Sequence, residues 1–154
     1  MSYFEEKKKH AYMCYKNGVP RKKVYAVVEK EDKYVVIKIS HGKYKYMLAG
    51  GGIEEGEDEA SAIKRECIEE LNMKVSFIKE LGIIRDTSNW EYNGEKFVVE
   101  DLMHIVLVKY ESYSNSTTMG VEGEFDKDDI VVEIDKKEML ENVAEFKKYG
   151  IKLI

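Results

Sequence analysis

Three glutamates in the middle of the chain have a spacing that could hold a divalent cation. Glu66, Glu69 and Glu70 are separated by steps of three and four residues, so on a helix they are neighbours on one face. Neighbouring like charges destabilise a helix by roughly 0.2–0.5 kcal/mol per pair. A chain that keeps such a cluster is expected to neutralise it, and Mg²⁺ is the natural counter-ion because it prefers carboxylate oxygens.

The residues before this cluster predict a glycine loop that runs into an amphipathic helix. The run Gly50-Gly51-Gly52 lets the backbone come close to the helix and to a ligand. Asp58 suits the N-cap because its side chain can accept backbone N–H bonds, and the helix is expected to continue to about Leu71. An apolar arc that can face a core is formed by Ala60, Ile63, Cys67 and Leu71.

The spacing resembles the signature of the Nudix hydrolases. That signature reads Gly-x5-Glu-x7-Arg-Glu-U-x-Glu-Glu-x-Gly-U, with U an aliphatic residue; its polar and glycine positions through Glu70 are matched by Gly51, Glu57, Arg65, Glu66, Glu69 and Glu70. Two positions depart from it. Cys67 replaces an aliphatic residue, and a free cysteine packs as a small hydrophobe. Asn72 replaces the closing glycine, and asparagine is the next-best residue for a left-handed helix end.

The resemblance implies a metal-dependent pyrophosphohydrolase, an enzyme that acts on acid anhydrides in phosphorus-containing compounds. Water would attack phosphorus and split the diphosphate linkage of a nucleoside diphosphate derivative or a nucleoside triphosphate. By position in the motif, Glu66, Glu69 and Glu70 are the expected ligands of Mg²⁺ or Mn²⁺, with Glu66 and Glu69 as catalytic residues and Glu66 also as a candidate base. Glu57 and Arg65 are expected to form an ion pair that fixes the loop, beginning at Gly51, against the helix.

Family members often recruit one more acidic ligand from outside the motif. Glu122 and Glu124 follow a long expected strand, and we expect Glu122 to be that ligand. Glu100 and Asp101 are alternatives; because adjacent side chains of a strand point to opposite faces, at most one of them would reach the site.

The aromatic and basic side chains leave two interpretations open. Trp90 and Tyr92 lie in an expected polar loop and could stack on a nucleotide base, although aromatic side chains mostly serve burial. The lysines and arginine of 7–9 and 21–23 could touch phosphates or could form a solvated face. No ligand spacing relates the three histidines, for which we expect structural or surface roles: His10, His41 and His104.

The rest of the chain predicts strands on both sides of the central helix. Strands are expected at 23–30, 34–40, 43–48, 75–84, 97–110 and 130–134, with loops at 85–96 and 111–128 and a helix at 136–148 ended by Gly150. Residues 1–22 are left without an assignment. This order favours an α/β or α+β sandwich, and the resemblance implies an α/β/α sandwich with a mixed central sheet.

Composition narrows the class of protein. A length of 154 residues suits one domain spanning 1–154, and 44% hydrophobic with 36% charged residues is typical of a globular chain. No apolar run approaches the roughly 18 residues of a membrane span, and no signal peptide is recognisable. Cys14 and Cys67 are then expected to be free thiols in a reducing cytoplasm.

The net charge of −5 argues against broad nucleic-acid binding, but it allows a small-molecule nucleotide held through metal ions. The alternative function is a Nudix-like domain that binds a nucleotide or metabolite as a regulator without hydrolysing it, since fold alone does not fix function. Relatives of that kind usually have an eroded motif, whereas the acidic positions here are complete. Homodimers are common in the family, so the resemblance allows a homodimer here.

Overall fold

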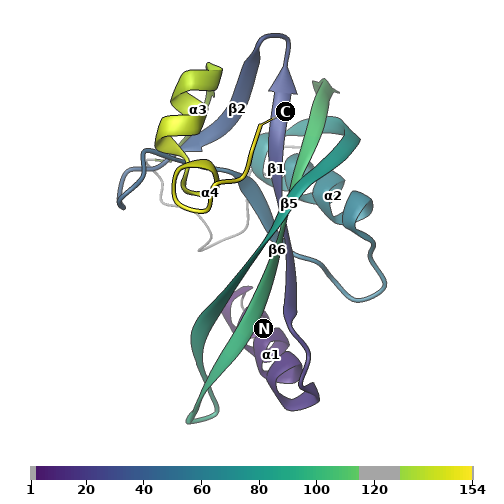
Figure 1. Cartoon of the computed structure of the whole chain (residues 1–154). Helices are drawn as coiled ribbons and strands as arrows, with labels where there is room; N and C mark the ends of the chain where they lie inside the picture. The colour runs from purple at the N-terminus through teal and green to yellow at the C-terminus, as the bar shows by residue number, and fades with distance from the viewer. Residues whose placement is uncertain (1–2, 115–128, 154) are drawn as a thin grey trace.

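A seven-stranded mixed β-sheet runs through the computed structural model, which describes residues 3–114 and 129–153. The strand order is β3-β2-β1-β6-β5, with β4 paired to β1 and β7 paired to β2. Only β1 and β6 run parallel among these pairs. The elements, shown in Figure 1, are α1 (Tyr3–Asn17), β1 (Arg21–Lys30), β2 (Lys33–Lys38), β3 (Tyr46–Met47), β4 (Ala49–Gly52), α2 (Glu59–Leu71), β5 (Met73–Tyr92), β6 (Glu95–Tyr113), β7 (Ile130–Ile134), α3 (Lys136–Asn142) and α4 (Ala144–Lys147).

Helices cover both faces of the sheet. Along β1 the side chains alternate, so that Val24 and Ala26 pack beneath α2 while Val27 packs on the other face. On that second face the core includes Met139 of α3 and Phe146 of α4. The expected sandwich of helices around a mixed sheet is therefore confirmed.

The central helix α2 begins and ends where its capping residues predict. Asp58 is extended and its Oδ1 accepts a 2.7 Å hydrogen bond from the N–H of Ser61. Asn72 adopts the left-handed conformation (φ 58°, ψ 37°), and its N–H donates to the carbonyls of Cys67 and Ile68. Asparagine thus ends this helix without the glycine of the motif.

The long hairpin of β5 and β6 corrects the expected polar loop at 85–96. The two strands pair from Met73 with Tyr113 to Tyr92 with Glu95, with three register irregularities on the way. Asn93 and Gly94 make the turn in left-handed conformations (φ 49° and 79°). This Asn-Gly pair is a strong hairpin signal, and because it lies inside the expected loop, strand residues precede and follow it.

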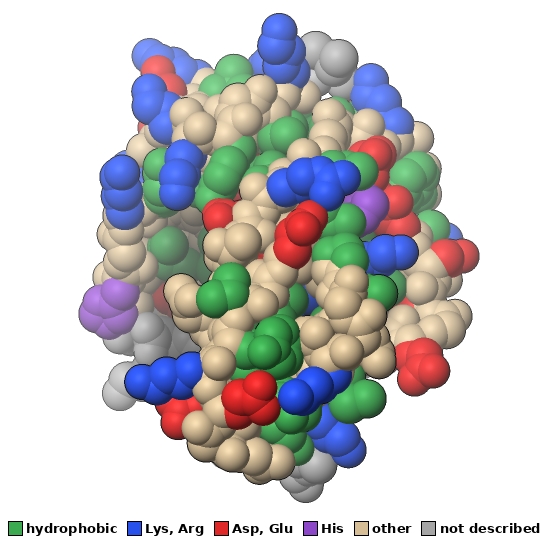
Figure 2. Space-filling view, turned by 60° about the horizontal axis from the view of Figure 1, so that its bottom comes forward, with side chains coloured by type: hydrophobic (Ala, Val, Ile, Leu, Met, Phe, Trp, Pro, Cys, Tyr) green, Lys and Arg blue, Asp and Glu red, His purple; other side chains and the backbone are tan. Residues whose placement is uncertain are grey.

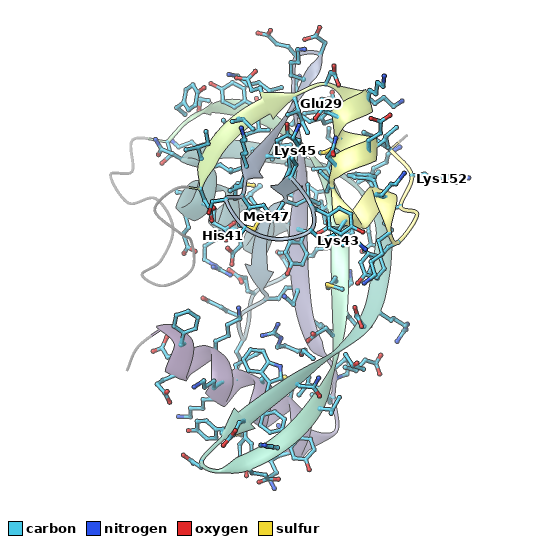
Figure 3. All side chains as sticks on the ribbon, turned by 90° about the vertical axis from the view of Figure 1, so that its left-hand side faces the viewer. Glu29, His41, Lys43, Lys45, Met47 and Lys152 are labelled. Carbon is cyan, nitrogen blue, oxygen red and sulfur yellow. The ribbon has the colours of Figure 1, made fainter. Side chains whose placement is uncertain are left out.

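The unassigned N-terminal segment forms α1, which packs against the far end of this hairpin (Figures 1 and 3). Ala11 and Cys14 of α1 are buried there together with Phe97 and Val99 of β6. A strand pair that projects beyond the sheet exposes its apolar side chains, and α1 covers part of them. On this end of the molecule other apolar side chains remain at the surface between acidic and basic ones (Figure 2).

Two expected elements near the chain's turns differ in detail. The strand expected at 43–48 is replaced by β3 and β4, which pair with different partners, β2 and β1. The helix expected at 136–148 is interrupted at Val143, which is extended and bridges to Tyr46. Gly150 follows the second piece with φ 71°, as expected of a terminating glycine. None of the helices described in residues 3–114 and 129–153 is long and apolar enough to cross a membrane.

Candidate active site

Arg65 is the centre of a charged network between α2 and the loop that precedes it. Its Nε and Nη2 donate to the two carboxylate oxygens of Glu57 at 2.8 and 3.0 Å, a bidentate pair, and Nη2 also donates to the carbonyl of Gly52 at 3.1 Å. The hydrogen bonds from Arg65 are the largest of the effects that lower the pKa of Glu57. The structure places Glu57 and Arg65 in the contact that the resemblance implies, with the guanidinium joining helix to loop.

The same guanidinium gathers two of the proposed metal ligands. Arg65 Nη1 donates to Glu66 Oε1 at 3.0 Å and to Glu69 Oε2 at 3.3 Å. Glu66 is buried, whereas the Glu69 side chain is 36% exposed. Because both oxygens accept from the same nitrogen of Arg65, the carboxylates of Glu66 and Glu69 lie near each other. The carboxylate of Glu66 is buried, and that of Glu69 is accessible to solvent.

The glycine strand β4 fits against the buried carboxylates. The N–H of Gly50 donates to Glu70 Oε2 at 2.9 Å, and a Cβ on Gly51 would lie 2.6 Å from Glu66 Oε1. Gly51 therefore leaves room for a carboxylate oxygen at this point rather than making a turn.

The donor set fits a hard divalent cation. Glu66, Glu69 and Glu70 offer carboxylate oxygens only, the ligands that Mg²⁺ and Mn²⁺ prefer. Each carboxylate here is bonded to an N–H group, of Arg65 or of Gly50. Among the described residues, these three glutamates do not bring one carboxylate oxygen each within 4.8 Å of one another. A different group of side chains, described below, does meet that separation. Each carboxylate has two oxygens, so it can keep its N–H contact and still bind a shared ion, but the three side chains would have to move closer together.

The acidic ligand expected from outside the motif is not located. Glu122, like Glu124, lies outside the described residues. Of the alternatives, Asp101 is buried and paired through Oδ1 with Arg21 Nε at 3.1 Å. Glu100 is exposed and pairs with Arg85 at 2.8 Å. The two adjacent side chains do point to opposite faces, and each has a cationic partner.

Trp90 and Tyr92 lie in the hairpin and pack toward α1. The indole Nε1 of Trp90 donates to Ser88 Oγ at 2.7 Å, and the Arg21 guanidinium stands 4.8 Å from its ring centre. The ring of Tyr92 lies 5.1 Å from that of Tyr12. Both side chains pack against the buried cluster formed by α1 and β6. Of the two interpretations of these aromatic residues, burial rather than base stacking therefore agrees with the structure.

A surface hollow of about 810 Å³ lies beside the loop that carries Glu57. Its walls come from α1, from residues 19–22 and from residues 53–57. Its lining includes Lys9, His10 and Lys22 as well as acidic side chains of α1 and of the loop. The pKa of His10 is lowered, first by burial and then by the charge of Arg21. The lysine side chains in this hollow can attract an anionic ligand.

Sequence reasoning missed a second group of ligand atoms. Glu59, Glu80 and His104 each place one such atom within 4.8 Å of the others, and no other set of three is found in the described ranges. They come from α2, β5 and β6, so no local spacing relates them. The expectation of a structural or surface role holds for the exposed His41, which sits in the loop after β2, away from α1 (Figure 3). For His104 the same expectation is incomplete, because this histidine lies beside Glu59 and Glu80.

The two cysteines are free and buried. Cys67 is fully buried on the core-facing side of α2, and burial, followed by the charges of Glu70 and Glu66, raises the pKa of its thiol. A protonated, inaccessible thiol packs as a hydrophobe and is a poor nucleophile.

Comparisons with known proteins agree with this architecture. The family model described as "NUDIX domain" matches residues 19–149. A search of curated proteins found no match. Among solved structures, a NUDIX hydrolase from Nitrosomonas europaea is similar with a TM-score of 0.52 and 23% identity, covering 78% of this chain and 75% of that one.

Two further structures show the same fold. The E. coli ORF135 protein has a TM-score of 0.52 and 19% identity, over 80% of each chain. A protein from Streptococcus suis described as an ADP-ribose pyrophosphatase has a TM-score of 0.52 and 12% identity, over 76% of this chain and 75% of that one. At these identities the likeness concerns the fold.

Proposed function

The chain belongs to the NUDIX domain family, and from that premise we propose that it hydrolyses the diphosphate linkage of a nucleoside diphosphate derivative or a nucleoside triphosphate with the help of Mg²⁺ or Mn²⁺. The observation that carries the proposal is the network of Arg65 with Glu57, Glu66 and Glu69. It supports an intact hydrolase motif, because an eroded site would have no reason to keep four charged side chains in register with a glycine strand. Two free thiols also fit a reducing compartment such as the cytoplasm.

Each part of the network has a task in this reaction. Glu66, Glu69 and Glu70 would hold the cation, which when bound neutralises charge on the diphosphate. Glu66, buried and fixed by Arg65, would accept the proton of the attacking water. Arg65 and Glu57 would keep the loop closed against α2, so that the carboxylates stay aligned through turnover.

The hollow beside the loop of Glu57 would receive the substrate. A volume of about 810 Å³ is sufficient for a nucleotide. Lys9 and Lys22 line the hollow together with Glu57, the partner of Arg65, so they would contact the phosphates of a substrate bound there. Replacing Lys9 or Lys22 with Gln is then expected to raise KM several-fold and to change kcat little, because these lysines contact substrate in both ground and transition states.

Product analysis tests the proposal. Purified protein with Mg²⁺ or Mn²⁺ would be given nucleoside triphosphates, oxidised nucleotides, sugar nucleotides and dinucleoside polyphosphates. Glu66→Gln is expected to lower kcat by about 10²–10⁴-fold, the usual contribution of a general base, and Glu69→Gln to abolish turnover. Glu91→Gln, an exposed glutamate of β5, is the matched control and should keep wild-type activity.

Metal-dependent cleavage that survives in the control and is lost in Glu69→Gln supports a pyrophosphohydrolase, and the best substrate names its subclass. Wild-type turnover in folded Glu69→Gln contradicts the assignment of the carboxylates. Absence of cleavage across the panel, together with nucleotide-induced thermal shifts, would favour the regulatory binding domain instead.

A further inference from the structure

Three side chains from separate elements converge outside the network of Arg65. Glu59 is the first residue of α2, Glu80 lies on β5 and His104 on β6. His104 Nδ1 lies 2.6 Å from Glu80 Oε1 and 3.8 Å from Glu59 Oε2. In the β5–β6 pairing a register irregularity separates Glu80 from Gly82, and such an irregularity re-aims the side chains beside it.

Two carboxyl groups share one imidazole in this group. Burial raises the pKa of Glu59, and the nearby charge of Glu80 and a hydrogen bond between the two carboxyl groups raise it further, while His104 acts in the opposite direction. Oε1 of Glu59 is buried and meets no hydrogen-bond donor among the described residues. A buried oxygen without a donor is costly, and a cation would remove that cost.

We propose that Glu59, Glu80 and His104 bind a divalent first-row transition ion of the Zn²⁺ type, with water completing the coordination. Three protein ligands of nitrogen and oxygen type plus water are an ordinary set for such an ion, and imidazole selects it over Mg²⁺. Ligand atoms within 4.8 Å of one another would have to shift by about 1 Å to reach bond lengths of about 2.0–2.2 Å. The Glu59 and Glu80 side chains are 29% and 35% exposed, which leaves them the freedom to do so.

The ion would tie the start of α2 to the β5–β6 hairpin. Because its ligands are different residues from Glu66, Glu69 and Glu70, binding is expected to occur whether or not those glutamates support catalysis. An ion that binds the folded chain and not the unfolded one raises the midpoint of thermal unfolding.

The test is a Zn²⁺ titration of chelator-treated full-length protein, with Mg²⁺ in excess so that carboxylate-only sites are filled. The ring nitrogens of the three histidines are followed by NMR, with His104→Gln used to assign the His104 signals, and thermal unfolding is recorded in parallel. One equivalent of Zn²⁺ is expected to shift the His104 ring signals and to raise Tm. Mg²⁺ alone should do neither.

Glu80→Gln, which keeps the shape of the side chain and removes its charge, should weaken Zn²⁺ binding by at least about tenfold. Glu91→Gln, on the same strand, should bind Zn²⁺ as the wild type does. The proposal is overturned if the His104 signals stay in place, if only His10 or His41 responds, or if folded Glu80→Gln binds as tightly as wild type.

Discussion

Gly51 and Glu66 are so close that no side-chain carbon fits between them: a Cβ on Gly51 would lie 2.6 Å from Glu66 Oε1. The neighbouring glycines differ in this respect. A Cβ on Gly50 would lie 2.1 Å from the carbonyl oxygen of Val24, which is backbone, whereas a Cβ on Gly52 meets nothing within 4 Å. The three consecutive glycines therefore have different surroundings: backbone at Gly50, a side chain at Gly51 and open space at Gly52.

An alanine substitution at each of the three positions should therefore have a different effect on stability and activity. Gly51→Ala is expected to fold, because a side chain can move aside, but to lower kcat by about tenfold or more, since a displacement of about 1 Å in a catalytic group can cost 10²-fold. Gly52→Ala should match wild type in stability and activity. Gly50→Ala should be strongly destabilised, because backbone must shift. Thermal unfolding and steady-state kinetics measure both effects, and full activity in Gly51→Ala would show that the position of Glu66 does not limit the reaction.

Arg65→Lys tests whether the guanidinium geometry matters beyond its charge. A lysine cannot make the bidentate pair with Glu57 and still reach the carbonyl of Gly52. We expect a loss of about 1–3 kcal/mol in the free energy of unfolding and a fall in kcat. Arg85→Lys is the control, because Arg85 is 72% exposed in its pair with Glu100 and such pairs contribute about 0–1 kcal/mol. Equal stabilities of the two variants in denaturant titrations would refute the role given to Arg65.

The sequence predicts the central helix well because its signals are local. The cap at Asp58, the left-handed end at Asn72 and the charged positions between them depend on residues within one or two turns of each other. The hairpin turn at Asn93 and Gly94 has a local signal too, but the polar residues around it favour a loop when the sequence is considered alone. On an exposed pair of strands polar side chains are compatible with regular pairing.

What the sequence could not predict depends on contacts between distant elements. The packing of α1 on the hairpin brings Cys14 to Phe97, and the group of Glu59, Glu80 and His104 requires α2, β5 and β6 to be in place. Neither has a periodicity or spacing of its own. The pairing of Asp101 with Arg21 is likewise a product of the parallel register of β1 and β6.

Asp101→Asn distinguishes a structural carboxylate from a metal ligand. Asp101 and Arg21 form a buried pair at 3.1 Å, with the guanidinium also stacked over Trp90. Removing one partner of a buried ion pair costs about 3–5 kcal/mol. Because asparagine still offers one acceptor to Arg21, we expect a smaller loss, of at least about 2 kcal/mol in the free energy of unfolding. Glu100→Gln, at the exposed neighbouring position, should change stability by less than about 0.5 kcal/mol. Unchanged stability with lost metal-dependent activity would instead identify Asp101 as a ligand.

Deprotonation of Lys23 is expected to raise the free energy of unfolding as the solution becomes alkaline. Burial, followed by the charges of Arg21 and Lys7, lowers the pKa of Lys23 from 10.5 to about 8, against the opposing charges of Asp101 and Glu145. Between these two values the unfolded chain binds the proton more than the folded chain does, so unfolding free energy rises with pH from about 8 to about 10.5 and is unaffected by this group below that range.

The size of that rise follows from the shift. One pKa unit corresponds to 1.36 kcal/mol, and with partial solvent screening the gain is expected to be about 2 kcal/mol. Because other groups also titrate there, the measurement is the difference in unfolding free energy between wild type and Lys23→Met at each pH, which should grow in favour of wild type from pH 8 upward. Lys23→Arg cannot lose its proton in this range, so its difference from Lys23→Met should stay constant. A wild-type curve parallel to that of Lys23→Met would mean that Lys23 keeps its charge in the folded protein.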